Sequence, residues 1–346
     1  MKKRLVYLDA LRIAACIMVV FIHVNAAFLY KEPVNSLSYL FVSAFNGLGF
    51  AGVNLFVMIS VALFLEKEKE LNLKTLYKHN ILRLLVVYYL WTLIFIISYH
   101  YKTGITSSDE FTDILRAFLC ADGTYHLWYL PMTIGLYMLL PVVKPAFENS
   151  IKISRYYVIL FFIVQIMLPF ILMFKFSGRS VILDLSTSQP LIAITGYLGY
   201  FVLGHFLNTE NFNKKERTTA LLVTGALTVI CIALAYTLSN IYKEPVTDLN
   251  TTFSLMTFSL SVFLFVLFKG VGFETVKEKT VRVITYILSL TLGIYLIHPL
   301  FLSVFSERFR LPAVPSVILT GLLVLVLSAA VTMIIRLIPK VGKYIT

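Results

Sequence analysis

The chain has 346 residues, of which 59% are hydrophobic and only 14% are charged, and its mean hydropathy is +0.85. Soluble globular proteins are about 25% charged, so this composition excludes a water-soluble fold that hides its apolar surface in a core. The apolar runs do not alternate with polar residues as the strands of a membrane barrel do. The sequence therefore predicts an all-α integral membrane protein.

Ten apolar runs approach the length of about 20 residues that a helix needs to cross a bilayer. They cover residues 6–29, 38–65, 80–101, 125–143, 156–176, 190–207, 217–240, 251–269, 282–304 and 313–338. No small-residue cleavage site follows the first run, so we expect a membrane span there and not a signal peptide. No connection is long enough to fold by itself. A single membrane-embedded domain is therefore expected over residues 1–346.

The basic residues predict how the chain is oriented. Most of the 30 Lys and Arg residues fall at the two chain ends and in alternate loops, 66–83, 144–155, 208–217 and 269–282. Lys and Arg are enriched in cytoplasmic loops, so both chain ends are predicted to be cytoplasmic. Arg83 is in position to bind a phosphate on that side, although a plain positive-inside anchor explains it as well. The net charge of +12 indicates contact with anionic lipid headgroups, and no nucleic acid partner is expected.

Three ionisable residues interrupt the first apolar run: Asp9, Arg12 and His23. They fall on one face of a helix, and His23 lies roughly 16 Å beyond Arg12 along its axis. Ionisable groups inside membrane spans are costly and often functional. For Asp9 and Arg12, an ion pair that locks helix packing is an equally good interpretation. For His23, which lies deeper, the favoured interpretation is a general base that accepts a proton from a hydroxyl nucleophile.

His126 and His298 fall at a depth similar to that of His23 on the predicted topology, toward the non-cytoplasmic side. The sequence does not establish that the three helices touch. A metal site is the weaker alternative, because no Cys cluster or i,i+4 His/Glu pair accompanies these histidines. Tyr295 lies one turn before His298. Trp128 follows His126 among other aromatics, which suits either an interfacial belt or stacking against a sugar or nucleotide ring.

Six short motifs resemble those of the acyltransferase-3 family, the ten-span membrane O-acyltransferases that modify bacterial surface glycans. Arg12 and His23 match the family's Arg-x10-His signature. The other motifs occur in the family's order: 52–60 (GVNLFVMIS, ending at Ser60), 83–88 (RLLVVY), 126–130 (HLWYL), 199–204 (GYFVLG) and 293–299 (GIYLIHP). Val61 and Val87 depart from the usual Gly and Pro of the family, which affects local backbone shape. The chain resembles the stand-alone type, without an esterase-like domain.

The resemblance implies a membrane O-acyltransferase of the bacterial plasma (inner) membrane. The donor would be an acyl-CoA, with acetyl-CoA favoured, and the acceptor a hydroxyl of a lipid-linked or cell-surface sugar. No permanently bound cofactor and no metal are expected. His23 would be the catalytic base and Arg12 its essential companion. The residues expected to bind the donor or the acceptor are Asp9, Ser60, Arg83, His126, Trp128, Tyr295 and His298.

Two other classes of function are compatible with ten spans. A transporter or flippase of a lipid-linked or surface glycan precursor could use the polar face of the first span as a substrate pathway. Such transporters usually carry internal repeats or broken helices at matching positions, and the sequence shows neither. A scaffold or receptor module without chemistry leaves Arg12 and His23 unexplained. Acyl transfer is therefore the favoured function.

Overall fold

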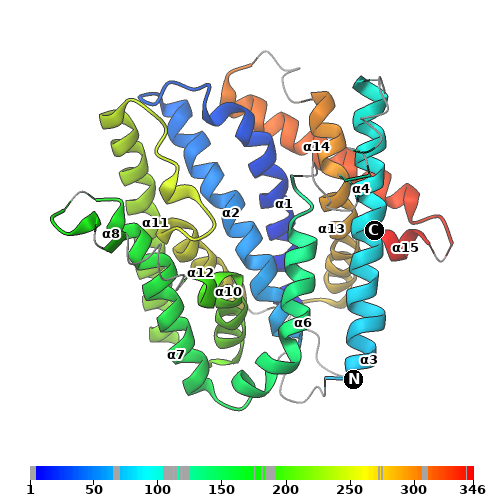
Figure 1. The fold of residues 1–346 in the computed structure, drawn as a ribbon, viewed down its shortest axis with the longest axis horizontal. Helices are drawn as coiled ribbons and strands as arrows, with labels where there is room; N and C mark the ends of the chain where they lie inside the picture. The colour runs from blue at the N-terminus through cyan, green and yellow to red at the C-terminus, as the bar shows by residue number, and fades with distance from the viewer. Residues whose placement is uncertain are drawn as a thin grey trace.

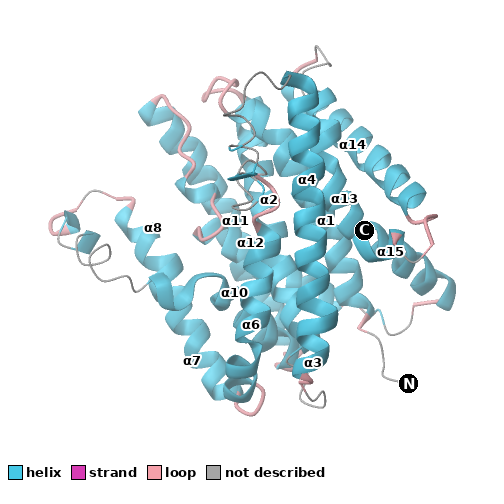
Figure 2. Ribbon diagram, turned by 45° about the vertical axis from the view of Figure 1, so that its right-hand side comes forward, coloured by secondary structure: helices cyan, strands magenta, loops and turns pink. Residues whose placement is uncertain are grey.

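The computed structural model describes residues 5–64, 71–103, 112, 115–116, 118, 125–174, 176–180, 182–183, 192–271, 273, 276–305, 311–339 and 341–346. Within these residues every regular element is a helix and no strand is present. Figure 2 shows the described helices gathered in one bundle. The predicted all-α membrane fold is confirmed.

The longer helices are α1 (Val6–Leu29), α2 (Leu37–Phe64), α4 (Leu82–Thr103), α6 (Tyr129–Phe147), α7 (Ile151–Phe161), α10 (Ile192–Thr209), α11 (Lys214–Tyr242), α12 (Leu255–Gly270), α13 (Glu278–Phe305) and α14 (Ala313–Ile335). The shorter elements are α3 (Leu73–Thr75), the π-helical turns η1 (Leu76–Ile81) and η2 (Phe162–Met167), α8 (Leu168–Leu172), the 3-10 turn η3 (Asp248–Asn250) and α15 (Gly342–Ile345). α3, η1 and α4 form one continuous span, and so do α7, η2 and α8.

Nine helices in the described part of the chain are long and apolar enough to cross a membrane. They coincide with nine of the ten apolar runs in the sequence. The remaining run, 190–207, falls on α10, whose backbone is non-helical at Gly196, with a φ of +34°. Glycine adopts such a conformation at little cost, so the helix bends there. The part of α10 after the bend is shorter than the roughly 20 residues of a full span. Hydropathy alone does not reveal a bend of this kind.

α1 lies inside the bundle, in contact with α2, α12, α13 and α14 (Figure 1). Gly52 permits the close approach of α2, because a Cβ there would lie 2.8 Å from the carbonyl oxygen of Ala15. Small residues at such crossings let helix backbones pack closely within membranes. The helix that carries Arg12 and His23 is therefore held by neighbours on several sides.

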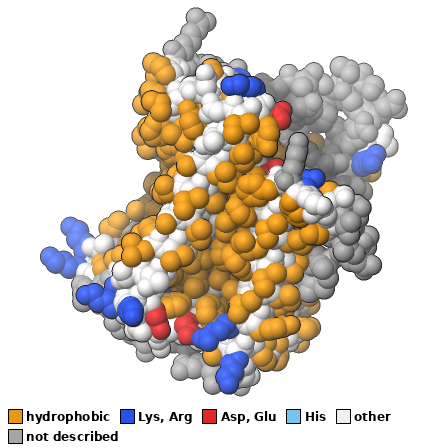
Figure 3. All heavy atoms as spheres, turned by 90° about the vertical axis from the view of Figure 1, so that its left-hand side faces the viewer, with side chains coloured by type: hydrophobic (Ala, Val, Ile, Leu, Met, Phe, Trp, Pro, Cys, Tyr) orange, Lys and Arg blue, Asp and Glu red, His pale blue; other side chains and the backbone are white. Residues whose placement is uncertain are grey.

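The outer surface is that of a protein surrounded by lipid. In Figure 3, hydrophobic side chains form a broad belt, and most charged side chains gather at its lower end. Leu222, Val229 and Ile241 of α11 are among the large hydrophobic side chains that are exposed. Such a surface is stable when acyl chains surround it. The chain is a multi-pass membrane protein, and the cytoplasmic placement of both ends stays a prediction.

Two short elements border the region of the predicted site. The π-helical turn η1 ends two residues before Arg83. Turns of this kind are rare and often occur at functional sites. The short helix α15 follows α14 and packs against α4 (Figure 1). The C-terminal helix α15 thereby lies against α4, which belongs to the third predicted span.

Candidate active site

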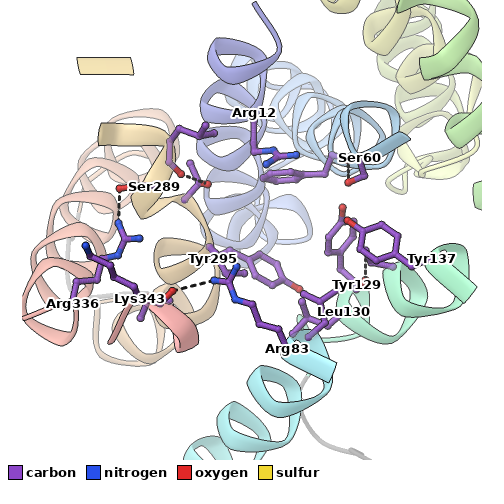
Figure 4. A pocket seen from close by; sticks show the side chains of 17 residues that line it. Arg12, Ser60, Arg83, Tyr129, Leu130, Tyr137, Ser289, Tyr295, Arg336 and Lys343 are labelled. Atoms are coloured by element: carbon purple, nitrogen blue, oxygen red, sulfur yellow. Dashed lines mark hydrogen bonds between the residues drawn. The ribbon is translucent and has the colours of Figure 1, made fainter. Parts of the chain in front are cut away.

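A cavity of about 450 Å³ lies among α1, α2, α4, α6, α13 and the segment after α14 (Figure 4). It is lined by Arg12, Phe56, Ser60, Arg83, Leu84, Tyr129, Leu130, Thr133, Tyr137, Leu288, Ser289, Thr291, Leu292, Tyr295, Arg336, Lys343 and Thr346. The predicted site residues in this wall are Arg12, Ser60, Arg83 and Tyr295. The predicted site residues outside it are Asp9, His23, His126, Trp128 and His298.

The ionisable lining of the cavity is basic. Arg12, Arg83, Arg336 and Lys343 contribute three guanidinium groups and one ammonium group. Among the described residues that line the cavity there is no Asp or Glu, and the other polar side chains are hydroxyls of Ser, Thr and Tyr. Guanidinium groups bind phosphate through paired, charge-assisted hydrogen bonds. The lining of the cavity therefore suits an anionic ligand.

Arg83 is held by the chain segment that follows α14. Its Nε donates to the carbonyl oxygen of Tyr344 at 2.9 Å, and its Nη2 donates to that of Lys343 at 3.2 Å. The guanidinium also lies over the Tyr344 ring, 5.9 Å from the ring centroid. Because a guanidinium has five N–H donors, donors remain for a ligand in the cavity. Arg83 thus joins two distant segments, which a simple interfacial anchor does not do.

Arg336 and Lys343 are not singled out by any sequence pattern, since Arg336 falls near the end of the last apolar run and both count only as basic residues of the chain end. Arg336 donates from Nη1 to the Ser289 hydroxyl of α13. Its Nε is buried and has no hydrogen-bond partner among the described residues. Lys343 belongs to α15 and lies on the same side of the cavity as Arg336 in Figure 4. The one sequence feature that could have indicated a role for Arg336 and Lys343 is their position just after the last membrane-spanning helix.

Three histidines from different elements meet next to the cavity. The rings of His23 on α1 and His298 on α13 stack with their centroids 5.2 Å apart. The His126 ring, just before α6, lies 5.6 Å from that of His298. His126 and His298 are buried, whereas His23 is only partly buried and is the most accessible of the three. No group of three or more His, Cys, Asp or Glu side chains within the described residues has a geometry that could hold a metal ion.

The imidazole of His298 has a defined orientation. Pro299 has no N–H, so the carbonyl group of Tyr295, one turn earlier, lacks its usual helical partner. The Nδ1 of His298 donates to that oxygen at 2.7 Å and lies 3.3 Å from the carbonyl oxygen of Ile294. A proton on Nδ1 leaves the lone pair on Nε2. Nε2 is buried and has no hydrogen-bond partner in the described part of the chain, so a proton acceptor stands beside His23.

Tyr295 lies between the cavity and the histidines. Its side chain lines the cavity, and its hydroxyl donates to the backbone carbonyl of His126. Its ring centroid lies 5.9 Å from that of His126 and 6.1 Å from that of His298. Tyr129, which also lines the cavity, packs 6.0 Å from the Tyr295 ring. The basic cavity and the histidine cluster are therefore adjacent.

Tyr125 borders the histidine cluster away from the cavity, and Trp128 and Asp9 lie outside the cavity wall. The Tyr125 ring lies 5.1 Å from that of His23, and Tyr125 is 61% exposed. Trp128 is 39% exposed and packs 5.5 Å from the ring of Tyr197. Asp9, in the first turn of α1, is partly buried and lies outside the cavity wall. The predicted site residues thus divide into a cavity group, a histidine group and these peripheral positions.

A comparison with protein families now bears on this geometry. The family model described as an acyltransferase domain matches residues 5–337 of the chain. The chain belongs to the acyltransferase-3 family. The match includes the histidine cluster and all of the cavity wall except Lys343 and Thr346. Comparisons with curated proteins and with solved structures gave no match. The resemblance seen in six motifs is confirmed, and the protein is a membrane acyltransferase.

Proposed function

We propose that this acyltransferase transfers an acyl group, with acetyl favoured, from acyl-CoA to a hydroxyl of a lipid-linked or cell-surface sugar in the bacterial plasma (inner) membrane. The observation that carries the proposal is the adjacency of two sites. One is an anion-binding cavity with four cations, and the other is a cluster of three histidines, with Tyr295 between them. A donor with a charged nucleotide end and a reactive thioester end needs one site of each kind.

The cavity supports CoA as the carrier of the acyl group. CoA has a diphosphate and a ribose phosphate at one end and the thioester at the end of a narrow pantetheine arm. In this arrangement the four cations bind the phosphates, and Ser and Thr hydroxyls donate further hydrogen bonds. The arm passes Tyr295 and brings the thioester to His23.

Arg12 binds the donor in this scheme and does not act beside His23. The two residues are three helical turns apart, a rise of roughly 16 Å. Arg12 lines the cavity, whereas His23 contacts His298. The Arg-x10-His signature thus places one residue at each end of an extended donor. In this scheme Arg12 remains the essential companion of His23, because it holds the donor whose thioester His23 acts on.

His23 acts as the general base. Its imidazole accepts the proton of the acceptor hydroxyl while that oxygen attacks the carbonyl carbon of the thioester. The new C–O bond forms, the C–S bond breaks, and the proton passes from His23 to the leaving CoA thiolate. His298, with its lone pair on Nε2, is a second proton acceptor in contact with His23.

Accessible aromatic side chains of the segment that carries His126 support a sugar as the acceptor. Tyr125 lies against His23 and is largely exposed, and Trp128, three residues later, is also partly accessible. Aromatic rings offer a large apolar face, on which the C–H groups of a pyranose ring pack, together with a polar edge. A sugar stacked there presents its hydroxyl groups to His23.

Transfer from radiolabelled acetyl-CoA to glycans in membranes that contain the protein tests this proposal. We expect labelled glycan with the wild type and none above background with His23→Ala. Label transfer that survives the substitution unchanged would remove His23 as the base. Movement of a glycan across the membrane without any acyl transfer would favour the transporter instead.

A further inference from the structure

The segment Val341–Thr346 is hydrogen-bonded to α4 through side chains of α4 that donate to its backbone carbonyl groups. Arg83 donates to the carbonyl oxygens of Lys343 and Tyr344, and Trp91 donates from Nε1 to the carbonyl oxygen of Ile345 at 3.1 Å. These oxygens belong to the last turn of α15, where carbonyl groups have no partner within the helix. Two side chains of one span therefore cap a short helix from a distant part of the sequence.

The same segment packs against the C-terminal end of α14. The N–H of Gly342 donates to the carbonyl oxygen of Ile338 at 3.0 Å. A Cβ on Gly342 would lie 2.1 Å from the carbonyl oxygen of Ile335 and 2.8 Å from the Cα of Arg336. Only glycine allows this close approach of the two backbones. Thr346, which lines the cavity, is 2% exposed.

A helix of four residues is not stable alone, because forming a first turn fixes several backbone dihedrals for very few hydrogen bonds. The contacts with Arg83, Trp91 and the end of α14 therefore decide where α15 lies. Because Lys343 and Thr346 line the cavity, these contacts also decide the shape and the charge of one cavity wall. The segment lies beyond the residues that the family model matches, so its contacts carry the inference by themselves.

We propose that Arg83, Trp91 and Gly342 are positioning residues that hold the segment Val341–Thr346 as a wall of the donor site, where Lys343 and Arg336 bind donor phosphate. The inference rests on the proposed function for the identity of the donor. Arg83 thus has two tasks, since it faces the cavity and also fixes the segment. Trp91 acts only through the segment, because it does not line the cavity.

Binding of CoA to the purified full-length protein tests the proposal without relying on catalysis. Trp91→Phe removes one donor and keeps an aromatic ring beside Phe95, whose centroid lies 6.3 Å away. Gly342→Ala displaces the segment without any change in charge. We expect each substitution to weaken the equilibrium binding of CoA about tenfold, the effect of losing one charge-assisted contact. Binding of pantetheine, which lacks the phosphates, is expected to stay the same.

Lys74→Gln is the matched control, because Lys74 is exposed on α3 and lies outside the cavity wall. It is expected to bind CoA like the wild type. With acetyl-CoA as the donor, we expect Trp91→Phe to raise KM and to leave kcat within about twofold. This split separates a positioning role from general destabilisation. If Gly342→Ala does not fold, as judged by thermal unfolding, Trp91→Phe decides by itself.

Unchanged CoA binding in Trp91→Phe would overturn the proposal. Equal weakening for CoA and pantetheine would also overturn it, because the segment would then support the fold and not the phosphates. A wild-type protein that does not bind CoA would have the same consequence. By contrast, CoA binding without acyl transfer would contradict the proposed function and leave the role of the segment intact.

Discussion

The imidazole of His298 stacks on that of His23 at a centroid distance of 5.2 Å and an interplanar angle of 27°. The two rings come from α1 and α13, helices that pack against each other within the bundle. His298 donates from Nδ1 to the carbonyl oxygen of Tyr295, which Pro299 leaves without its helical partner, whereas His23 is only partly buried. The pair thus combines an oriented, buried imidazole with one that is less deeply buried.

His298→Gln is expected to lower kcat at least tenfold and to leave the KM for acyl-CoA within about twofold. The reason is that His298 touches His23 and does not line the donor cavity. Steady-state transfer rates with labelled donor measure both constants. His79→Gln is a matched control, since His79 is exposed and lies outside the cavity wall. A normal kcat in His298→Gln would show that this residue serves packing alone.

Arg336→Gln is expected to raise the KM for acyl-CoA about tenfold, because a charge-assisted hydrogen bond contributes roughly 1.5–3 kcal/mol. Arg336→Lys keeps the charge but not the planar fork, so an intermediate KM is expected. Raising the ionic strength is expected to increase the KM of the wild type more than that of Arg336→Gln. Lys152→Gln, at an exposed site on α7, is the control. Equal KM values for Arg336→Gln and the wild type would exclude Arg336 from the donor site.

Tyr295→Phe keeps the ring between the cavity and the histidines but removes its hydroxyl. The carbonyl oxygen of His126 then loses the donor observed here. An unpaired buried polar group costs about 1–3 kcal/mol, so a lower unfolding temperature is expected. Thermal unfolding of the purified protein measures the change, with Tyr156→Phe as the control at an exposed site on α7. An unfolding temperature equal to that of the wild type would mean that this hydrogen bond adds nothing to stability.

Most of the helices could be predicted from the sequence because lipid imposes a length and an apolar composition on every span. The depth of His23, His126 and His298 followed from the same count of spans. Their contact did not follow, since it depends on which helices pack together. The bend at Gly196 was also beyond the reach of hydropathy, because a glycine in an apolar run has no distinct signal.

The cavity was only partly predictable for a related reason. Arg12, Ser60 and Tyr295 belong to motifs, and their sequence context indicated a site. Arg336 and Lys343 reach the cavity because the chain folds back after α14, and that fold depends on hydrogen bonds from Arg83 to backbone oxygens. Every residue has a backbone carbonyl group, so the acceptor residues need no particular side chain and the sequence does not mark them.

The role of His23 as the general base is decided by the kcat/KM for acyl transfer, compared between the purified wild type and His23→Gln. The general-base role predicts a fall of about 10²–10⁴-fold in His23→Gln, with His79→Gln equal to the wild type and CoA binding unchanged in both. A His23→Gln protein that transfers acyl groups at the wild-type rate would rule out His23 as the general base.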